Sequence, residues 1–173
     1  MIIASNFLQG KVKLPQETII RINIAWVKSK SELRKIVRDN KNNVVFLDFP
    51  QGRTKPPKPV ISLFDSIDIA NDNDNVKYFA ISNSEDPFFL KSIRKRIRKS
   101  IEIVPKIESS FGIEKFSEII EACNTDTAML DKEDLFTSIF GDTERFFSLV
   151  DLARDKSDKN KVNLLELQGV IFG

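Results

Sequence analysis

The sequence contains no histidine and a single cysteine, Cys123, among its 173 residues. Without histidine, the chain cannot build a Ser-His-Asp or Cys-His nucleophile system, a histidine-ligated zinc site or a histidine general base. One cysteine cannot form an intramolecular disulfide or a cysteine-cluster metal site, and it is compatible with a reducing compartment. Any chemistry must therefore come from carboxylates, lysines, arginines and a hard metal ion.

An excess of charge of one sign is also lacking, since 27 lysines and arginines nearly balance 25 aspartates and glutamates. This balance gives no overall attraction to nucleic acid or to anionic lipid. The basic stretch 91–99 carries Ile93 and Ile97 at helical spacing, so we interpret it as the solvated face of a helix. Residues 1–8 are too short for a signal sequence, and no apolar run approaches the ~20 residues of a membrane span. We therefore expect a cytoplasmic protein with no nucleic-acid or membrane partner.

What the sequence does contain is an alternation of short apolar runs with amphipathic stretches. The capping-box spacing of Ser29 and Glu32 predicts a helix that starts there. Strands alternating with single helices are typical of βαβ units and a parallel sheet. The predicted strands are residues 1–5, 18–26, 43–50, 76–82, 101–108, 127–131, 162–167 and 169–172, and the further predicted helices are 84–99, 111–123 and 142–155.

Six to eight such units favour a (β/α)₈ barrel, although such barrels typically have ~250 residues. A chain of 173 residues therefore predicts a reduced or partial TIM barrel, built as one domain over residues 1–173. An open doubly wound sheet is the alternative. If too few strands close the barrel, the exposed sheet edges must be covered, and a homodimer would cover them.

The strongest local signal for chemistry is Lys106-Ile107-Glu108, at the carboxyl end of a predicted strand. Because strand side chains alternate, Lys106 and Glu108 share a face. The next predicted strand leads to Asp134, and two carboxylates at neighbouring strand ends suit Mg²⁺ or Mn²⁺. The alternative is a structural ion pair. Glu108 and Asp134 within reach of one ion, with Arg21 facing them, would support an active site. A direct pair of Lys106 with Glu108 or Glu133, with side chains filling the mouth of the barrel, would exclude one.

Arg21 and Asn23 share a face of an earlier predicted strand, and Asp48 ends the strand after it. An arginine at the active end of a sheet can clamp a carboxylate or a phosphate. A solvated edge residue and a structural ion pair are the alternatives for Arg21, and a turn residue is the alternative for Asp48.

These residues resemble a known family. The stretch PKIESSFGIEKFSEIIEA followed by AMLDKEDL, residues 105–122 and 128–135, looks like the fifth and sixth barrel strands of pyruvate kinase. Arg21-Ile22-Asn23 is similar to the R-x-N motif of that family's second strand, and Leu47-Asp48 with Gly52 and Arg53 is similar to its third strand and turn. The resemblance covers most of the chain and is strongest over residues 105–135.

The resemblance implies roles for these residues. Glu108 and Asp134 would bind a divalent metal, and Lys106 would be catalytic by neutralising the phosphoryl group in transfer. Arg21 would be both catalytic and substrate-binding, through contact with the substrate phosphate. Asn23 and Asp48 would match substrate-side ligands that bind K⁺ in the family, although Ala25 stands where the family has a potassium-binding serine.

Further departures count against phosphoryl transfer from a nucleotide. Trp26 replaces a histidine and Glu133 replaces a glycine, and we expect the chain to lack the lid and C-terminal domains of pyruvate kinases. The same region is also similar to the HpcH/HpaI aldolases and citrate lyase β-subunits, in which Glu133-Asp134-Leu135 matches an E-D-L motif. That resemblance implies a lyase that uses Mg²⁺ to stabilise an enolate.

The sequence therefore predicts a magnesium-binding site for a phosphoenolpyruvate or pyruvate-like 2-oxo acid in a barrel of the phosphoenolpyruvate/pyruvate superfamily. Its activity would be that of a pyruvate kinase-like transferase or of a lyase. A non-catalytic remnant barrel that binds a small molecule or a partner protein is the third possibility.

Overall fold

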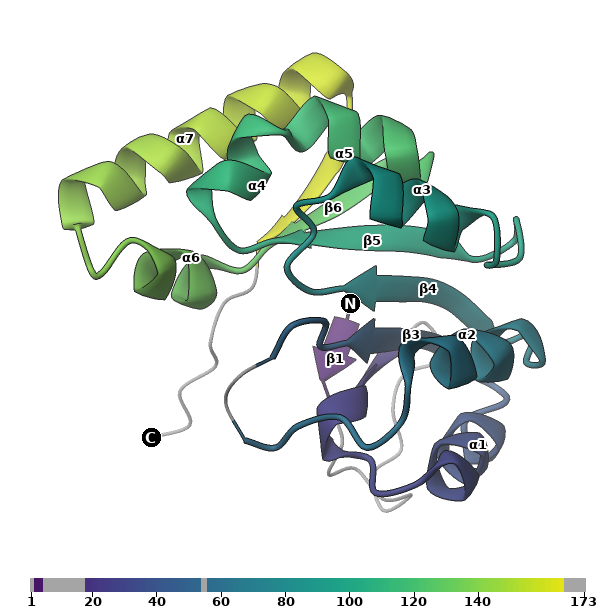
Figure 1. Ribbon diagram of the computed structural model, residues 1–173. Helices are drawn as coiled ribbons and strands as arrows, with labels where there is room; N and C mark the ends of the chain where they lie inside the picture. Colours follow the sequence, from purple (N-terminus) through teal and green to yellow (C-terminus); the bar gives the residue numbers. More distant parts are fainter. Residues whose placement is uncertain (1, 5–17, 54–55, 167–173) are drawn as a thin grey trace. The chain divides into compact units, whose positions relative to one another are not determined.

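The structure is a computed structural model that describes residues 2–4, 18–53 and 56–166 (Figure 1). By its internal contacts the chain forms two compact units. Unit 1 comprises Met1–Ser82 and Lys95–Glu102, and unit 2 comprises Asn83–Arg94 and Ile103–Gly173. In each unit, parallel strands alternate with helices, so the chain has the predicted α/β fold of a partial TIM-like barrel. The prediction of one domain over residues 1–173 stays a prediction.

The strands of unit 1 pair in parallel in the order of the chain. They are β1 (Ile2–Ala4), β2 (Ile19–Asn23), β3 (Val44–Phe49) and β4 (Val76–Ile81). The sequence VVFLDF of β3 is almost continuously apolar, and its residues from Val45 to Phe49 are all buried. Burial on both faces is typical of a central parallel strand, which explains why this strand reads as an unbroken apolar run.

The helices of unit 1 begin at side-chain caps. The Ser29 hydroxyl accepts a hydrogen bond from the Glu32 backbone N–H at 3.1 Å, so the predicted capping box starts α1 (Lys30–Asp39). No helix is predicted over residues 63–71, yet α2 (Leu63–Asn71) forms there. Its cap repeats the same pattern, because Ser62 accepts from the Asp65 N–H at 3.1 Å.

Two predicted elements, one from each unit, are shorter than expected. The strand predicted over residues 18–26 ends at Asn23, whose side chain accepts from the Ala25 N–H at 3.0 Å and starts the 3₁₀ helix η1 (Ile24–Trp26). The helix predicted over 84–99 ends at Arg94, since the chain beyond it turns into unit 1. There the Asn71 side-chain amide donates to the Arg96 carbonyl and accepts from the Arg98 N–H. These backbone groups therefore bond to Asn71 and not to other residues of a continued helix.

The strands of unit 2 also pair in parallel in chain order. They are β5 (Glu102–Ile107), β6 (Thr127–Leu130) and β7 (Asn163–Glu166). Figure 1 shows helices α3 (Pro87–Arg94), α5 (Phe116–Cys123) and α7 (Thr143–Asn160) on one face of these strands. The predicted helix 111–123 is interrupted at Lys115, and its first part is α4 (Ser110–Glu114). The strand predicted over 169–172 lies outside the described residues.

The described part of the chain contains no helix that could span a membrane. Each helix there is either too short or too polar to cross a lipid bilayer.

Candidate metal centre

The register of β5 and β6 places two acidic residues side by side. Ile107 pairs with Leu130 across the two parallel strands, so Glu108 and Asp131, which follow them, leave the sheet at the same carboxyl edge. The Asp131 backbone N–H donates to the Ile107 carbonyl at 3.1 Å and ties the two strand ends together. The sheet itself therefore fixes the backbone from which these carboxylates extend.

A third carboxylate comes from the helix that follows β6. Asp131 is the N-cap of α6 (Lys132–Ser138), and its Oδ1 accepts from the Asp134 N–H at 3.3 Å. The interpretation of Asp134 as a strand-end residue is wrong, because the strand stops at Leu130 once Asp131 caps the helix. Asp134 lies in the first helical turn instead. Residues three apart on a helix lie on the same side, so its side chain returns toward Asp131.

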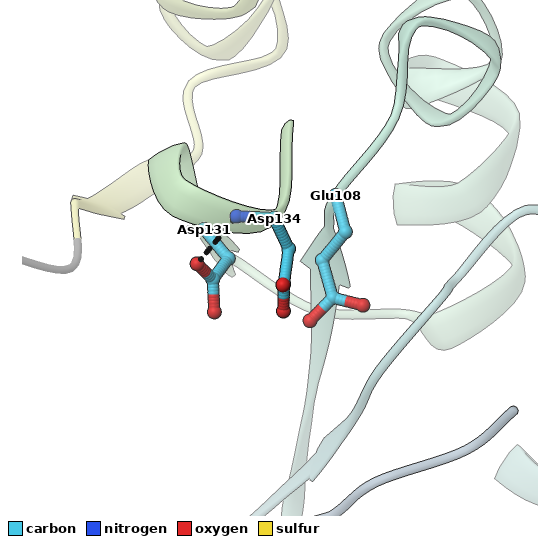
Figure 2. A group of neighbouring side chains, drawn as sticks. All are labelled: Glu108, Asp131 and Asp134. Carbon is cyan, nitrogen blue, oxygen red and sulfur yellow. Dashed lines mark hydrogen bonds between the residues drawn. The ribbon is translucent and has the colours of Figure 1, made fainter. Parts of the chain in front are cut away.

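The three carboxylates form one cluster. Glu108, Asp131 and Asp134 each offer an oxygen atom, and these atoms all lie within 4.8 Å of one another. Figure 2 shows the three side chains directed to the same side of the strand ends. Ligands on opposite sides of a Mg²⁺ ion are about 4.2 Å apart, given Mg–O distances of about 2.1 Å. The oxygens therefore need only a small adjustment to surround such an ion, and an all-carboxylate set fits Mg²⁺ or Mn²⁺.

Lys106 lies against this cluster. Its Nζ atom is 2.7 Å from Glu108 Oε1 and 3.4 Å from Asp131 Oδ2. Lys106 and Glu108 are both buried, and their direct contact agrees with the prediction that they share a face. The structure thus combines two arrangements that the sequence offers as alternatives, namely a Lys106–Glu108 ion pair and carboxylates within reach of one ion.

Glu108 has the most constrained carboxylate of the cluster. Its Oε2 accepts from the Asn83 backbone N–H at 2.8 Å. Its Oε1 is buried and accepts no regular hydrogen bond from the described residues, although the Lys106 ammonium lies beside it. Burial raises the pKa of the Glu108 carboxyl, against the opposing effects of Lys106 and the Asn83 N–H. A nearby cation is therefore what this carboxylate needs to remain ionised at low energetic cost.

The site residues predicted in unit 1 form a separate arrangement. The Arg21 guanidinium pairs with Asp48, with Nε 3.0 Å from Oδ2. Asn23 lies opposite Asp48 in the β2–β3 register, and its side chain caps η1. Asp48 is only 1% exposed, and its Oδ1 has no hydrogen-bond partner among the described residues. The substrate-binding roles of these residues, and a K⁺ site at Asn23 and Asp48, stay predictions.

Asp131 is the cluster residue that sequence reasoning missed. Its signal is the Asp-x-x-Asp spacing of residues 131–134 directly after an apolar strand, because Asp is a preferred N-cap. A helix start at this point would have placed Asp131 at the strand edge beside Glu108.

Comparison with known proteins identifies a fold. No protein-family model matches the sequence, and no curated protein matches it either. The crystal structure of citrate synthase SbnG superposes with a TM-score of 0.65 at 11% sequence identity, over 88% of this chain and 68% of that chain. Macrophomate synthase superposes with a TM-score of 0.65 at 12% identity, over 84% of this chain and 62% of that one. At such identities the likeness establishes the fold and leaves the activity to the residues themselves.

Proposed function

We propose that unit 2 carries a Mg²⁺- or Mn²⁺-dependent site that binds a pyruvate-like 2-oxo acid and promotes formation of its enolate in a carbon–carbon lyase or synthase reaction. The observation that carries this proposal is the convergence of Glu108, Asp131 and Asp134 at one strand edge. The likeness of the fold to two synthases supports carbon–carbon chemistry over phosphoryl transfer. The pyruvate kinase-like transferase stays a prediction without support of its own.

Each residue has a part that its surroundings suggest. Glu108, Asp131 and Asp134 would hold the ion, and the Asn83 N–H would keep Glu108 turned toward it. A divalent ion bound there would supply the positive charge that polarises a carbonyl oxygen as negative charge develops on it. The Lys106 ammonium would balance the charge of the acid's carboxylate.

Ligand binding tests the proposal directly. We expect calorimetric titration to detect Mg²⁺ and Mn²⁺ binding, and oxalate, a planar mimic of the pyruvate enolate, to bind only when the metal is present. Asp134→Asn should abolish both signals. Asp126→Asn is the matched control, because Asp126 is an exposed aspartate just before β6, at the opposite end of that strand. Loss of binding in both variants, or in neither, would contradict the assignment.

Enolate formation has its own readout. A protein that removes a methyl proton from pyruvate returns a deuteron in D₂O, so the methyl signal in the proton NMR spectrum should decay. We expect this exchange to require the metal and to disappear in Asp134→Asn but not in Asp126→Asn. Metal-dependent oxalate binding without exchange would leave a binding site and remove the catalytic part of the proposal.

A structural role without ligand binding is the second candidate, and the Lys106–Glu108 ion pair is the observation that favours it. In that case the cluster would be a structural network, and neither metal nor oxalate would bind. A homodimer that covers open sheet edges, a cytoplasmic location and the absence of nucleic-acid partners stay predictions. Sedimentation velocity would test the first of these, since a monomer at all concentrations contradicts it.

A further inference from the structure

Lys106 and a divalent ion would require the same oxygens. The Lys106 Nζ lies 2.7 Å from Glu108 Oε1 and 3.4 Å from Asp131 Oδ2, between two of the three carboxylates that converge at this edge. The other Glu108 oxygen is engaged by the Asn83 N–H. Oε1 is therefore the Glu108 oxygen best placed for a cation, and it is the one that Lys106 contacts.

The two cations cannot both lie there. Nζ already lies beside Glu108 Oε1 and near Asp131, and a divalent ion held by the same carboxylates would repel the ammonium strongly in a buried site. Lysine, however, has a flexible four-carbon stem with a compact charge at its tip. The ammonium can therefore leave while the backbone of β5 stays in place.

We propose that Lys106 is a displaceable internal cation that lowers the metal affinity of the cluster and is turned toward the substrate's anionic group when the metal binds. This inference rests on the proposed function and adds to it an order of events. Before metal binding, Lys106 compensates the buried charge of Glu108. Afterwards the ion does so, and the freed ammonium stays at the same strand edge because its Cα is held in β5.

The proposal predicts effects of opposite sign from one substitution. Lys106→Met removes the competitor, so Mn²⁺ should bind about tenfold more tightly in the absence of oxalate. The same substitution removes a charged partner of the anion, so oxalate should bind the Mn²⁺-saturated protein about tenfold more weakly. If Lys106 had only a structural role, its loss would disorder the cluster, and the affinities for Mn²⁺ and for oxalate would both fall.

Lys132→Met is the matched control. Lys132 belongs to the same unit and pairs with Glu166 at 3.0 Å, and it follows Asp131 in the sequence. Its loss removes one positive charge close to the cluster without removing the competitor for Glu108. Free Mn²⁺, measured from its electron paramagnetic resonance signal, gives the affinity of each protein. Equal or weaker Mn²⁺ binding by Lys106→Met than by the wild type or by Lys132→Met would overturn the proposal.

A measurement on the wild-type protein covers the case in which Lys106→Met does not fold. Acetic anhydride labels accessible lysine amines, and mass spectrometry reports the extent at each position. Labelling of Lys106 should be low without metal, rise several-fold with Mn²⁺, and fall again when oxalate is added, whereas Lys132 should stay constant. No rise with Mn²⁺ in a protein that binds Mn²⁺ overturns the displacement alone, while the absence of Mn²⁺ binding in every protein overturns the proposed function as well.

Discussion

In unit 1, strands β2 and β3 carry one arginine and one buried aspartate that pair with each other. In unit 2, the carboxyl edge of β5 and β6 brings three carboxylates together, and one lysine lies beside two of them. Both arrangements use the side-chain alternation of parallel strands. They differ in the ratio of charges. The Arg21–Asp48 pair is balanced one to one, while the Lys106 ammonium is shared by Glu108 and Asp131, with Asp134 beside them.

The difference teaches what each cluster is suited to do. A balanced buried pair carries no excess charge, and its principal effect is on the stability of the fold, since removal of one partner leaves an uncompensated charge. A cluster with more carboxylates than its lysine neutralises gains from a further or stronger cation. The same residue types therefore point to a structural role in unit 1 and to metal binding in unit 2.

The largest expected effect breaks the balanced pair. Arg21→Met leaves the Asp48 carboxylate, 1% exposed, without its guanidinium. We expect the free energy of unfolding to fall by about 3–5 kcal/mol, as for other buried pairs that lose one partner. Urea unfolding measures this loss. The double variant Arg21→Met/Asp48→Asn should recover much of the stability, because the buried charge is then absent as well.

If Arg21→Met lowers the free energy of unfolding by less than about 1 kcal/mol, this interpretation is contradicted, because solvent-exposed ion pairs contribute amounts in that range. Arg21 would then be available for the substrate-binding role predicted from the sequence, and the contrast between the two units would disappear.

Part of both clusters could be predicted from the sequence because it depends only on local periodicity. Lys106 shares a strand face with Glu108, and Arg21 shares one with Asn23, because successive side chains of a strand point to opposite faces. This alternation is local, so it can be read from the sequence. The fold class follows likewise from the order of strands and helices. An ion pair at Arg21 could be predicted only as one alternative and without its partner, because Arg21 and Asp48 lie on two strands whose register the sequence does not give.

The rest depended on where one strand ends. The letters D-K-E-D-L at 131–135 fit either a strand that continues to Asp134 or a helix that starts after Asp131. The structure selects the helix, because the Asp131 side chain accepts from the Asp134 N–H. That single choice adds Asp131 to the cluster and moves Asp134 from the strand end to a helical turn.

The next largest effect tests the metal side of the comparison. Glu108→Gln keeps an oxygen to accept from the Asn83 N–H but removes one of the three carboxylate charges of the cluster. We expect Mn²⁺ affinity to fall about a hundredfold, which corresponds to about 2.7 kcal/mol. Without metal, the free energy of unfolding should change by less than in Arg21→Met, because burial already raises the Glu108 pKa and makes its ionised form costly.

Glu166→Gln is the control for this substitution, since it makes the same chemical change at the end of β7, on the other side of β6 from β5. It should leave Mn²⁺ affinity unchanged. A large loss of unfolding free energy in metal-free Glu108→Gln, together with unchanged Mn²⁺ affinity, would show that unit 2 holds a structural pair like that of unit 1.

The smallest expected effect compares two carboxylates within unit 2. Glu166 has two cations for one carboxylate, whereas Glu108 shares one lysine with a second carboxylate. The Glu166 carboxylate lies between Arg154, at 2.8 Å, and Lys132, at 3.0 Å. Hydrogen bonds from Arg154 first, and then from Lys132, lower the pKa of Glu166 from 4.5 to about 2. Because the pKa is lower in the folded state, this carboxylate stabilises the fold fully above the unfolded value of 4.5 and loses that contribution as the pH falls toward 2.

Unfolding free energies measured from pH 7 down to pH 2 would reveal this contribution. It should be on the order of 1 kcal/mol, because Arg154 is half exposed and solvent screens the pair. Glu166→Gln should remove that part of the acid sensitivity and flatten the curve between pH 4.5 and 2 relative to the wild type. Identical curves would mean that Arg154 and Lys132 do not stabilise the ionised Glu166 carboxylate. The ratio of cations to carboxylates would then not explain how Glu166 differs from Glu108.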